Sequence, residues 1–251
     1  MTARDPRRAL GRAVRQHVES LQAFGVTAVP KAVGPSTGRS EPGRSRDRSA
    51  VTGVSAERPA NDKVKRLNDL AAQAQQCKKC SLYRTRTHCV FSDGSSQAQL
   101  MFIGEAPGRD EDLQGIPFVG AAGQLLTKMI VAMGLRREDV YICNVLKDRP
   151  PGNRTPLPEE VDACMPFLVQ QLAIIQPKVI CVLGAVAAKA LLGPHVAITK
   201  IRGQVWDYQG TPLVPTFHPA YLLRNPPAKK FAWEDLKRVK KLLDAPRIPH
   251  T

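Results

Sequence analysis

The sequence predicts an α/β protein with three layers, α/β/α, around a central four-stranded parallel sheet. Short apolar runs alternate with amphipathic segments from residue 100 to residue 244. Buried strands that are separated by helices are typical of a parallel sheet covered on both faces. Polar or aromatic residues on turns with Gly or Pro follow several of these runs. Sheets of this class gather their functional groups at the carboxyl ends of the strands, so the pattern also predicts where a site would lie.

The expected elements follow one another in alternation. A helix over residues 62–76 leads to a pair of cysteines, and the strands and helices come after it. Gly134 and Gly193 stand where two of the helices need C-terminal caps. The expected strands are 100–104, 140–145, 179–183 and 213–217, and the expected later helices are 121–133, 157–174, 185–192 and 230–244.

The first 60 residues differ in composition from the rest. Leu and Val recur at helical spacing in residues 1–30, which predicts a short amphipathic helix. This helix is either a docking element for a protein partner or a loosely held appendage. Residues 31–60 are rich in Pro, Gly, Ser and Arg and hold almost no large apolar residue, which predicts a disordered basic linker. The folded domain is then expected over residues 61–251.

The chain is strongly basic, with a net charge of +15. Residues 1–60 hold eleven Lys or Arg against five Asp or Glu, so most of the excess lies on residues 61–251. A cationic surface is typical of proteins that bind a polyanion, most often nucleic acid, although an arginine-rich solvated face is the alternative. No apolar run reaches about 18 residues and no secretory signal core is present. We therefore expect a cytoplasmic, nucleoid-associated monomer with no membrane contact.

Four short segments carry most of the functional signal. Turns built from Gly and Pro hold a side chain rigidly and let the backbone approach a ligand closely, so four of them in one sheet predict the walls of a single pocket. The segments are Gly-Glu-Ala-Pro-Gly at 104–108, Pro-Phe-Val-Gly at 117–120, Arg-Pro-Pro-Gly-Asn-Arg at 149–154 and Phe-His-Pro-Ala-Tyr-Leu-Leu-Arg at 217–224. Together they resemble the uracil-DNA glycosylases of family 4, which carry an iron–sulfur cluster. The resemblance runs from about Asn61 to about Leu243.

The resemblance implies hydrolysis of the N-glycosidic bond of uracil in DNA, the start of base-excision repair. The base would leave the duplex stack and enter the pocket. Phe118 would stack on it, and the Asn144 amide would match the O4 and N3–H groups of uracil, a pattern that cytosine reverses. Core packing for Phe118 and strand-end capping for Asn144 are the plain structural roles that compete with this interpretation. The implied substrate-binding residues are Gly104, Ala106, Phe118 and Asn144.

The resemblance also implies catalytic roles. His218 would donate a hydrogen bond to uracil O2, where negative charge grows as the bond breaks, and such a bond can be worth about 3–4 kcal/mol. Ala106 stands where the best-known branch of the superfamily has Asp, so water activation falls to Glu105, with Glu111 and Asn153 as helpers. Glu105 could instead bind the base edge or a backbone amide.

DNA contacts are expected from two segments. Leu222 and Leu223 could form an apolar wedge that fills the gap left by a flipped base, although at least one of them is expected to pack into the core. Arg224 and Arg154 would hold phosphates. The chain has no Lys-Arg-Arg-Ile-His insert of the kind that one branch uses to bond covalently to DNA, so turnover is expected.

The resemblance also implies a [4Fe–4S] cluster, and one residue of its ligand motif departs from the family pattern. Cys77, Cys80 and Cys164 match the family's ligands, but Asp148 stands where a Lys-Cys-Arg-Pro-Pro run has its cysteine. Asp148 as an oxygen ligand of a labile cluster is the first interpretation. Cys143 or Cys89 could replace it, although the former belongs to the strand that presents Asn144 and the latter is expected in a strand core. A three-iron cluster, no cluster, or zinc at the cysteines would also be compatible with these residues.

Three functions are compatible with these patterns. The leading one is the uracil-DNA glycosylase. The second is a weak or inactive DNA-binding accessory protein whose iron–sulfur site is impaired by the change at position 148. The third is a related glycosylase with a broader choice of bases.

Overall fold

The computed structural model describes residues 57–246, all within one compact unit, Gly53–Thr251. The expected N-terminal helix and most of the expected linker lie outside the described residues. Helix α2 covers Glu57–Gln76, so the helix begins five residues before its predicted start. The prediction that the linker reaches residue 60 was therefore wrong over residues 57–60.

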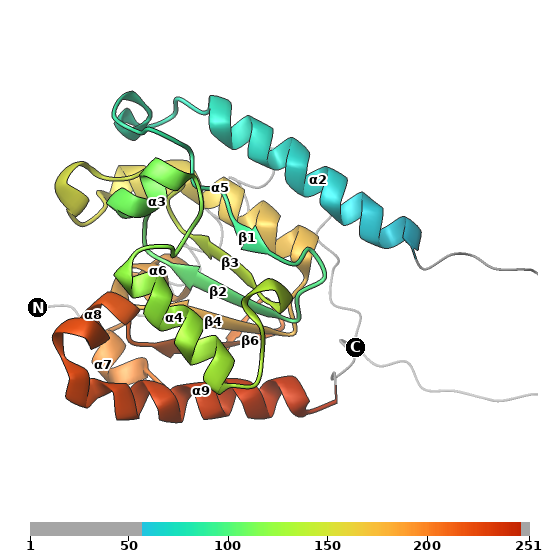
Figure 1. Ribbon diagram of the computed structural model, residues 1–251, viewed down its shortest axis with the longest axis vertical. Helices are drawn as coiled ribbons and strands as arrows, with labels where there is room; N and C mark the ends of the chain where they lie inside the picture. The colour runs from blue at the N-terminus through green and yellow to red at the C-terminus, as the bar shows by residue number, and fades with distance from the viewer. Residues whose placement is uncertain (1–56, 247–251) are drawn as a thin grey trace, which may run out of the picture. The chain divides into compact units, whose positions relative to one another are not determined.

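Six strands form a single sheet in the order β1-β3-β2-β4-β6-β5 (Figure 1). The four inner strands are parallel, as predicted. Two short outer strands pair antiparallel with them, so the expected count of four was too low. The inner strands are β2 (Leu100–Gly104), β3 (Tyr141–Asn144), β4 (Val179–Leu183) and β6 (Thr211–Thr216), and the outer ones are β1 (Asp93–Gly94) and β5 (Trp206–Tyr208).

Each inner strand sends alternate side chains into two separate cores. In β2, Met101 and Ile103 pack in one core, whereas Leu100 and Phe102 pack in the other. Figure 1 shows α2 and α5 along one side of the sheet and α4 and α9 along the other. The three predicted layers are thus present. The helices of the layers are α2, α5 (Pro158–Ile175) and α6 (Ala185–Leu192) around the first core, and α4 (Ala121–Ala132) and α9 (Lys229–Asp244) around the second.

Short helical turns stand where the sequence indicated loops. α3 (Arg109–Gln114) follows β2, η3 (Pro151–Asn153) follows β3, and α8 (Pro219–Arg224) follows β6. Because β2, β3 and β6 are parallel, these turns lie at one edge of the sheet. The remaining short helices are η1 (Ser81–Arg84), η2 (Arg137–Asp139), α7 (Ile198–Ile201) and η4 (Pro226–Ala228). Within residues 57–246, none of the helices has the length and apolar character to cross a membrane.

Candidate active site

One cavity of about 570 Å³ lies at the carboxyl edge of the sheet. All four predicted segments contribute to its wall, which mixes polar with apolar side chains. The structure therefore brings these distant segments together around one space. Of the predicted site residues, the wall contains Glu105, Ala106, Glu111, Phe118, Asn144, Asn153, Arg154, His218 and Arg224.

Gly104, Asn144 and Phe118 meet in a close packing arrangement. Gly104 and Asn144 are register partners at the ends of β2 and β3. A Cβ atom on Gly104 would lie 2.3 Å from Asn144 Oδ1 and 2.4 Å from Phe118 Cζ, so only glycine allows both side chains this position. Asn144 is 1% exposed, and its Oδ1 has no hydrogen-bond partner among the described residues. A buried polar atom without a partner costs about 1–3 kcal/mol, so this amide is suited to pairing with a ligand.

Hydrogen bonds from two side chains hold the turn that contains Phe118. Phe118 has a φ of 56°, a left-handed conformation that is uncommon for a bulky residue. The carboxylate of Glu111 accepts from the backbone N–H groups of the two residues after Phe118, at 2.9 Å each, and from Gly108 N at 3.0 Å. Arg137 donates to the Phe118 carbonyl at 3.2 Å and to the preceding carbonyl at 2.7 Å. Glu111, predicted as a catalytic helper, thus has both oxygens engaged in holding the turn.

His218 caps the N-terminus of α8. Its Nδ1 accepts a hydrogen bond from the Ala220 backbone N–H at 3.1 Å, which leaves the ring proton on Nε2. Burial, assisted by the charge of Arg224, lowers the pKa of His218 to about 4. The imidazole centroid lies 5.7 Å from that of Phe118 at an interplanar angle of 32°. A neutral imidazole with an N–H donor therefore stands beside the aromatic ring that lines the cavity.

The other predicted catalytic residues differ in how they are held. Glu105 is partly buried, and desolvation raises the pKa of its carboxyl group. Among residues 57–246 no hydrogen bond or ion pair occupies that carboxylate, so it is available to a water molecule. The side chain of Asn153 is exposed and accepts from Arg149 Nε at 2.7 Å.

The predicted DNA contacts separate into two classes. Leu223 is 42% exposed, whereas Leu222 is 1% exposed and belongs to the second core. The expectation that at least one of the two leucines packs into the core is thus confirmed, and Leu223 is the one placed to contact DNA. Arg224 is exposed and makes no ion pair within the described part of the chain. Arg154 instead forms an ion pair at 2.6 Å with the buried carboxylate of Glu160.

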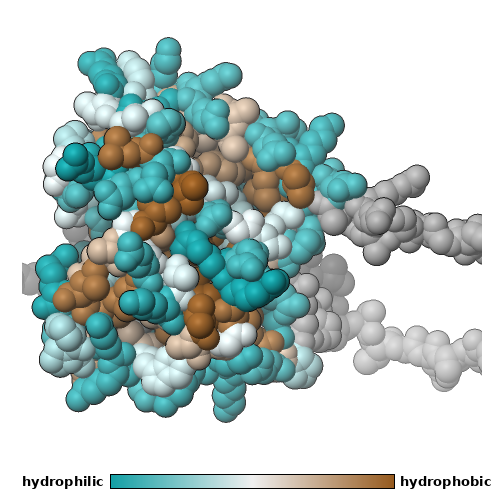
Figure 2. Space-filling view, in the orientation of Figure 1, coloured by the Kyte–Doolittle hydropathy of each residue, from teal (hydrophilic) through white to brown (hydrophobic). Residues whose placement is uncertain are grey.

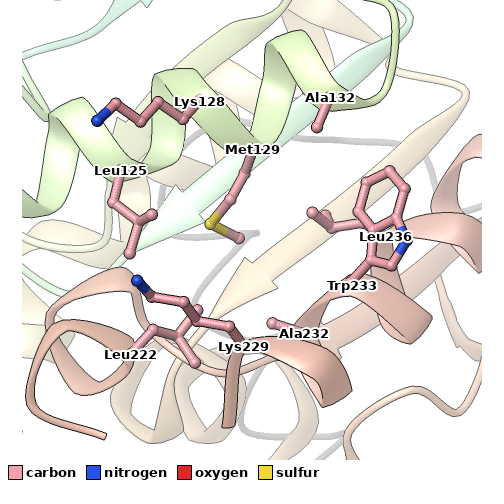
Figure 3. A pocket seen from close by; sticks show the side chains of 9 residues that line it. All are labelled: Leu125, Lys128, Met129, Ala132, Leu222, Lys229, Ala232, Trp233 and Leu236. Carbon is pink, nitrogen blue, oxygen red and sulfur yellow. The ribbon is translucent and has the colours of Figure 1, made fainter. Parts of the chain in front are cut away.

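Leu222 also lines a second hollow. It has a volume of about 210 Å³, is almost wholly apolar and lies between α4 and α9. Figure 3 shows Leu125 and Met129 of α4 above Leu222, with the amino groups of Lys128 and Lys229 at one end. Figure 2 shows an apolar patch over this region among hydrophilic side chains. Apart from Leu222, the hollow contains no predicted site residue.

Five cysteines lie on the α2 and α5 side of the sheet, and one of them, Cys143, is inside β3. The thiols of Cys80 and Cys164 are hydrogen-bonded to each other, and Cys77, Cys80 and Cys89 pack against the core that contains Cys164. The sulfur of Cys164 also accepts from the backbone N–H of Lys147. Within residues 57–246, no three His, Cys, Asp or Glu side chains converge so as to hold a single metal ion.

Asp148 has a cationic partner that the sequence did not indicate. Arg86 Nη1 donates to its two carboxylate oxygens at 3.1 and 3.0 Å. Burial raises the pKa of Asp148, and the Arg86 charge opposes that rise. The Cys89 thiol is hydrogen-bonded to the same carboxylate. Cys89 lies in the loop before β1, so its expected position in a strand core was wrong.

Lys147 is a further supporting residue that sequence reasoning missed. Its side chain is 2% exposed and donates to the Asn144 carbonyl at 2.6 Å and to Gln171 Oε1 at 2.7 Å. It therefore holds the end of β3 where Asn144 is presented. A buried lysine has no local sequence signal, so the sequence could not indicate this role.

Comparisons with known proteins agree with this geometry. The model of the uracil DNA glycosylase superfamily matches residues 91–237. Type-4 uracil-DNA glycosylases from Archaeoglobus fulgidus and Thermotoga maritima are 44% and 46% identical to the chain, over 70% and 69% of its length and 92% and 93% of their own. One from Sulfurisphaera tokodaii is 44% identical over 72% of the chain and 86% of its own length. The chain belongs to the uracil-DNA glycosylase superfamily, in its type-4 branch.

Proposed function

We propose that this protein hydrolyses the N-glycosidic bond of uracil in DNA and so starts base-excision repair. The observation that carries the proposal is the buried Asn144 amide, whose Oδ1 has no partner beside the ring of Phe118. A uracil stacked on that ring would bring its polar edge to the amide. The activity for which the type-4 relatives are named supports the same proposal.

Base selection follows from the amide. Asn144 offers an acceptor to the uracil N3–H and a donor to O4. Cytosine presents an acceptor at N3 and an amino group at C4, so both pairings fail and each unpaired group costs about 1–3 kcal/mol. Gly104 keeps the space open, because a Cβ there would overlap the Asn144 and Phe118 side chains. These residues require the base to leave the stack before it binds.

Bond cleavage needs stabilisation at both ends of the breaking bond. As the bond from N1 to C1′ breaks, the electron pair moves onto uracil, and His218 Nε2–H donates to O2 to hold the anion. Glu105 orients a water molecule whose oxygen bonds to the cationic C1′. The proton of that water passes to Glu105 and then to solvent. The uracil anion later takes a proton at N1, which completes the hydrolysis.

Residues at the outer part of the carboxyl edge of the sheet hold the DNA. Leu223 is exposed on α8 and can fill the space that the flipped base leaves, while Arg224 can bind a flanking phosphate. Arg154 shares its charge with Glu160 and contributes less. The protein would act as a monomer on nucleoid DNA in the cytoplasm.

The resemblance to family 4 adds a [4Fe–4S] cluster, and three cysteines support this as thiolate donors. Cys77, Cys80 and Cys164 lie on one side of the sheet, and the sulfurs of the last two accept backbone N–H bonds from Leu82 and Lys147, as suits thiolates. Each iron of such a cluster takes one thiolate, so the ligands need not converge on one atom. When bound, the cluster would supply a rigid link between the end of α2 and the start of α5.

A cleavage assay tests the proposal. A duplex oligonucleotide with one uracil is incubated with stoichiometric protein in buffer without magnesium, and alkali then cuts any abasic site. We expect cleavage at the uracil position and free uracil in solution, because every proposed catalytic group is a side chain. The same duplex with cytosine at that position is the control. An intact uracil duplex after prolonged incubation would contradict the proposal.

A further inference from the structure

We infer that Cys89 is the fourth thiolate of the iron–sulfur site and that Asp148 serves as the partner of Arg86. The inference rests on the cluster of the proposed function. It concerns a departure specific to this chain, in which a carboxylate occupies the position of an expected cysteine and a thiol lies directly beside it.

Asp148 already forms an ion pair with Arg86. The side chains of Arg86 and Asp148 are 14% and 6% exposed, and the ion pair between them is 3.0 Å long. Arg86 also donates to the carbonyl oxygens of Ala74 and Gln75, the last turn of α2 before Cys77. The Asp148 carboxylate therefore neutralises a guanidinium that ties the end of α2 to the loop after β3.

Iron ligation by Asp148 would disturb this pairing. An oxygen given to iron would weaken both bonds from Arg86 Nη1, and the guanidinium would stay half-buried against the α2 carbonyls. Breaking a buried ion pair by removing one partner is strongly destabilising, because it leaves an uncompensated charge. A thiolate that already lies beside the site avoids this cost and is also the usual iron ligand.

Cys89 has the required position. The backbone N–H of Val90 donates to the Lys147 carbonyl at 2.8 Å, which fixes the loop of Cys89 beside the chain that enters Asp148. The Cys89 side chain lies beside the Asp148 carboxylate and near Cys77. Because residue 89 is in a loop, its side chain can turn toward a cluster without distorting the sheet.

The other cysteines are placed less well. Cys143 and Cys181 are both 0% exposed and lie inside the central strands β3 and β4. Cys143 pairs with Ile103 in the sheet register, and Cys181 belongs to the core on the opposite face from Cys164. Cys143 lies on the same side as Cys164 but is fixed inside β3, so Cys89 is the further thiol of that side that lies in a loop. Arg86 offsets the extra negative charge that Asp148 adds near the cluster.

Iron analysis of single and paired variants tests the inference. The full chain and its variants are purified without oxygen, reconstituted with iron and sulfide, and analysed for iron, acid-labile sulfide and visible absorption. Cys89→Ser should lose at least about 10-fold in iron retained under a chelator, because even the loss of a residue that only supports a metal ligand costs about 10–100-fold in affinity. Asp148→Asn should keep its iron, because the amide oxygen can still accept a hydrogen bond from Arg86. Cys181→Ala is the control for loss of a buried thiol.

A rescue variant separates ligation from folding. Cys89→Ser combined with Asp148→Cys should regain iron, because a thiol returns at the neighbouring position. If Asp148→Asn loses iron while Cys89→Ser retains it, the carboxylate is the ligand and the inference is wrong. Failure of the wild-type chain to hold iron, or failure of the rescue, also overturns it. Uracil release measured on the same wild-type sample keeps the two proposals distinct, since full iron without excision contradicts only the proposed function.

Discussion

His218 shows how one local bond sets a chemical role. Because Nδ1 accepts the Ala220 N–H, the proton stays on Nε2, and because burial lowers the pKa to about 4, the ring is neutral near pH 7. A neutral donor aimed at a developing anion needs no proton transfer. The residue can therefore stabilise the leaving uracil over the whole physiological pH range.

His218→Ala should reduce the single-turnover rate of uracil excision by about 10²-fold or more, since it removes a donor that acts on developing charge. Binding to abasic DNA should change little, because no charge develops in that complex. His195→Ala, at an exposed histidine outside the cavity, is the matched control. A rate for His218→Ala within about threefold of the control would remove His218 from catalysis.

We expect the excision rate to fall at low pH, and we expect protonation of Glu105 to cause this acid limb of the pH–rate profile. Its carboxylate must be ionised to orient water, so the rate should rise with pH as the group loses its proton. Desolvation raises the pKa of Glu105, which places this limb above the usual range of a carboxylate. His218, with a pKa of about 4, should add no further limb from about pH 5 to about pH 8.

Single-turnover rates of uracil excision from about pH 5 to about pH 8 measure this acid limb. Glu105→Gln should be slow at all pH values and should lack the acid limb, because the amide does not titrate. Glu138→Gln, at an exposed carboxylate in η2, should keep the wild-type profile. A Glu105→Gln variant that retains the limb would assign it to another group.

The sequence predicted the functional residues that lie on the turns, but it did not predict the residues whose side chains hold those turns in place. Phe118 and His218 stand in segments with Gly or Pro, which local pattern can identify. Arg137 and Arg86 act through contacts that bridge 20 and 62 positions of the chain. Such pairings depend on how strands stack in space, and neither residue lies in a motif.

At the scale of elements, α8 places two adjacent leucines in different environments. On one turn of a helix, neighbouring side chains point about 100° apart, so a six-residue helix can bury one and expose the next. Leu222 enters the apolar hollow between α4 and α9, and Leu223 faces solvent beside Arg224. The sequence alone presented these as two equivalent leucines, because the short helix was expected as a loop.

The pair allows a matched test. Leu222→Ala should lower the free energy of unfolding by about 2–5 kcal/mol through the cavity it leaves. Leu223→Ala should leave stability unchanged but weaken excision from duplex more than from single-stranded DNA, because the wedge is needed only where a partner strand must be kept apart. Thermal unfolding and excision rates on both substrates provide the readout. If Leu223→Ala lowers the excision rate equally on duplex and single-stranded DNA, Leu223 does not act as a wedge.

Element type and order were largely predictable, whereas the sheet edges were not. The inner strands and the long helices have strong apolar periodicity, and β2 and β4 fall at their predicted bounds. β1 and β5 contain two and three residues, too few for any alternation to be visible. The start of α2 lies in polar sequence, where helix and linker have similar composition.

At the scale of the whole molecule, charge is divided between the domain and the N-terminal residues. Residues 1–52 hold ten Lys or Arg against four Asp or Glu. None of the residues assigned to the cavity or to the iron–sulfur site lies there. We therefore expect these residues to affect how often the enzyme meets DNA and not the chemical step.

Removal of residues 1–52 should leave the single-turnover rate at saturating enzyme unchanged and weaken the binding of undamaged DNA. Each cation that contacts a phosphate releases about 0.9 counterion, so the shortened chain should show a smaller salt slope, and the two affinities should approach each other as salt rises. A full-length variant with Arg4, Arg7, Arg8, Arg12 and Arg15 changed to Gln controls for charge alone. If that variant binds like wild type while the truncation binds weakly, the segment acts through something other than charge. If the truncated chain fails to fold, the N-terminal residues belong to the domain after all.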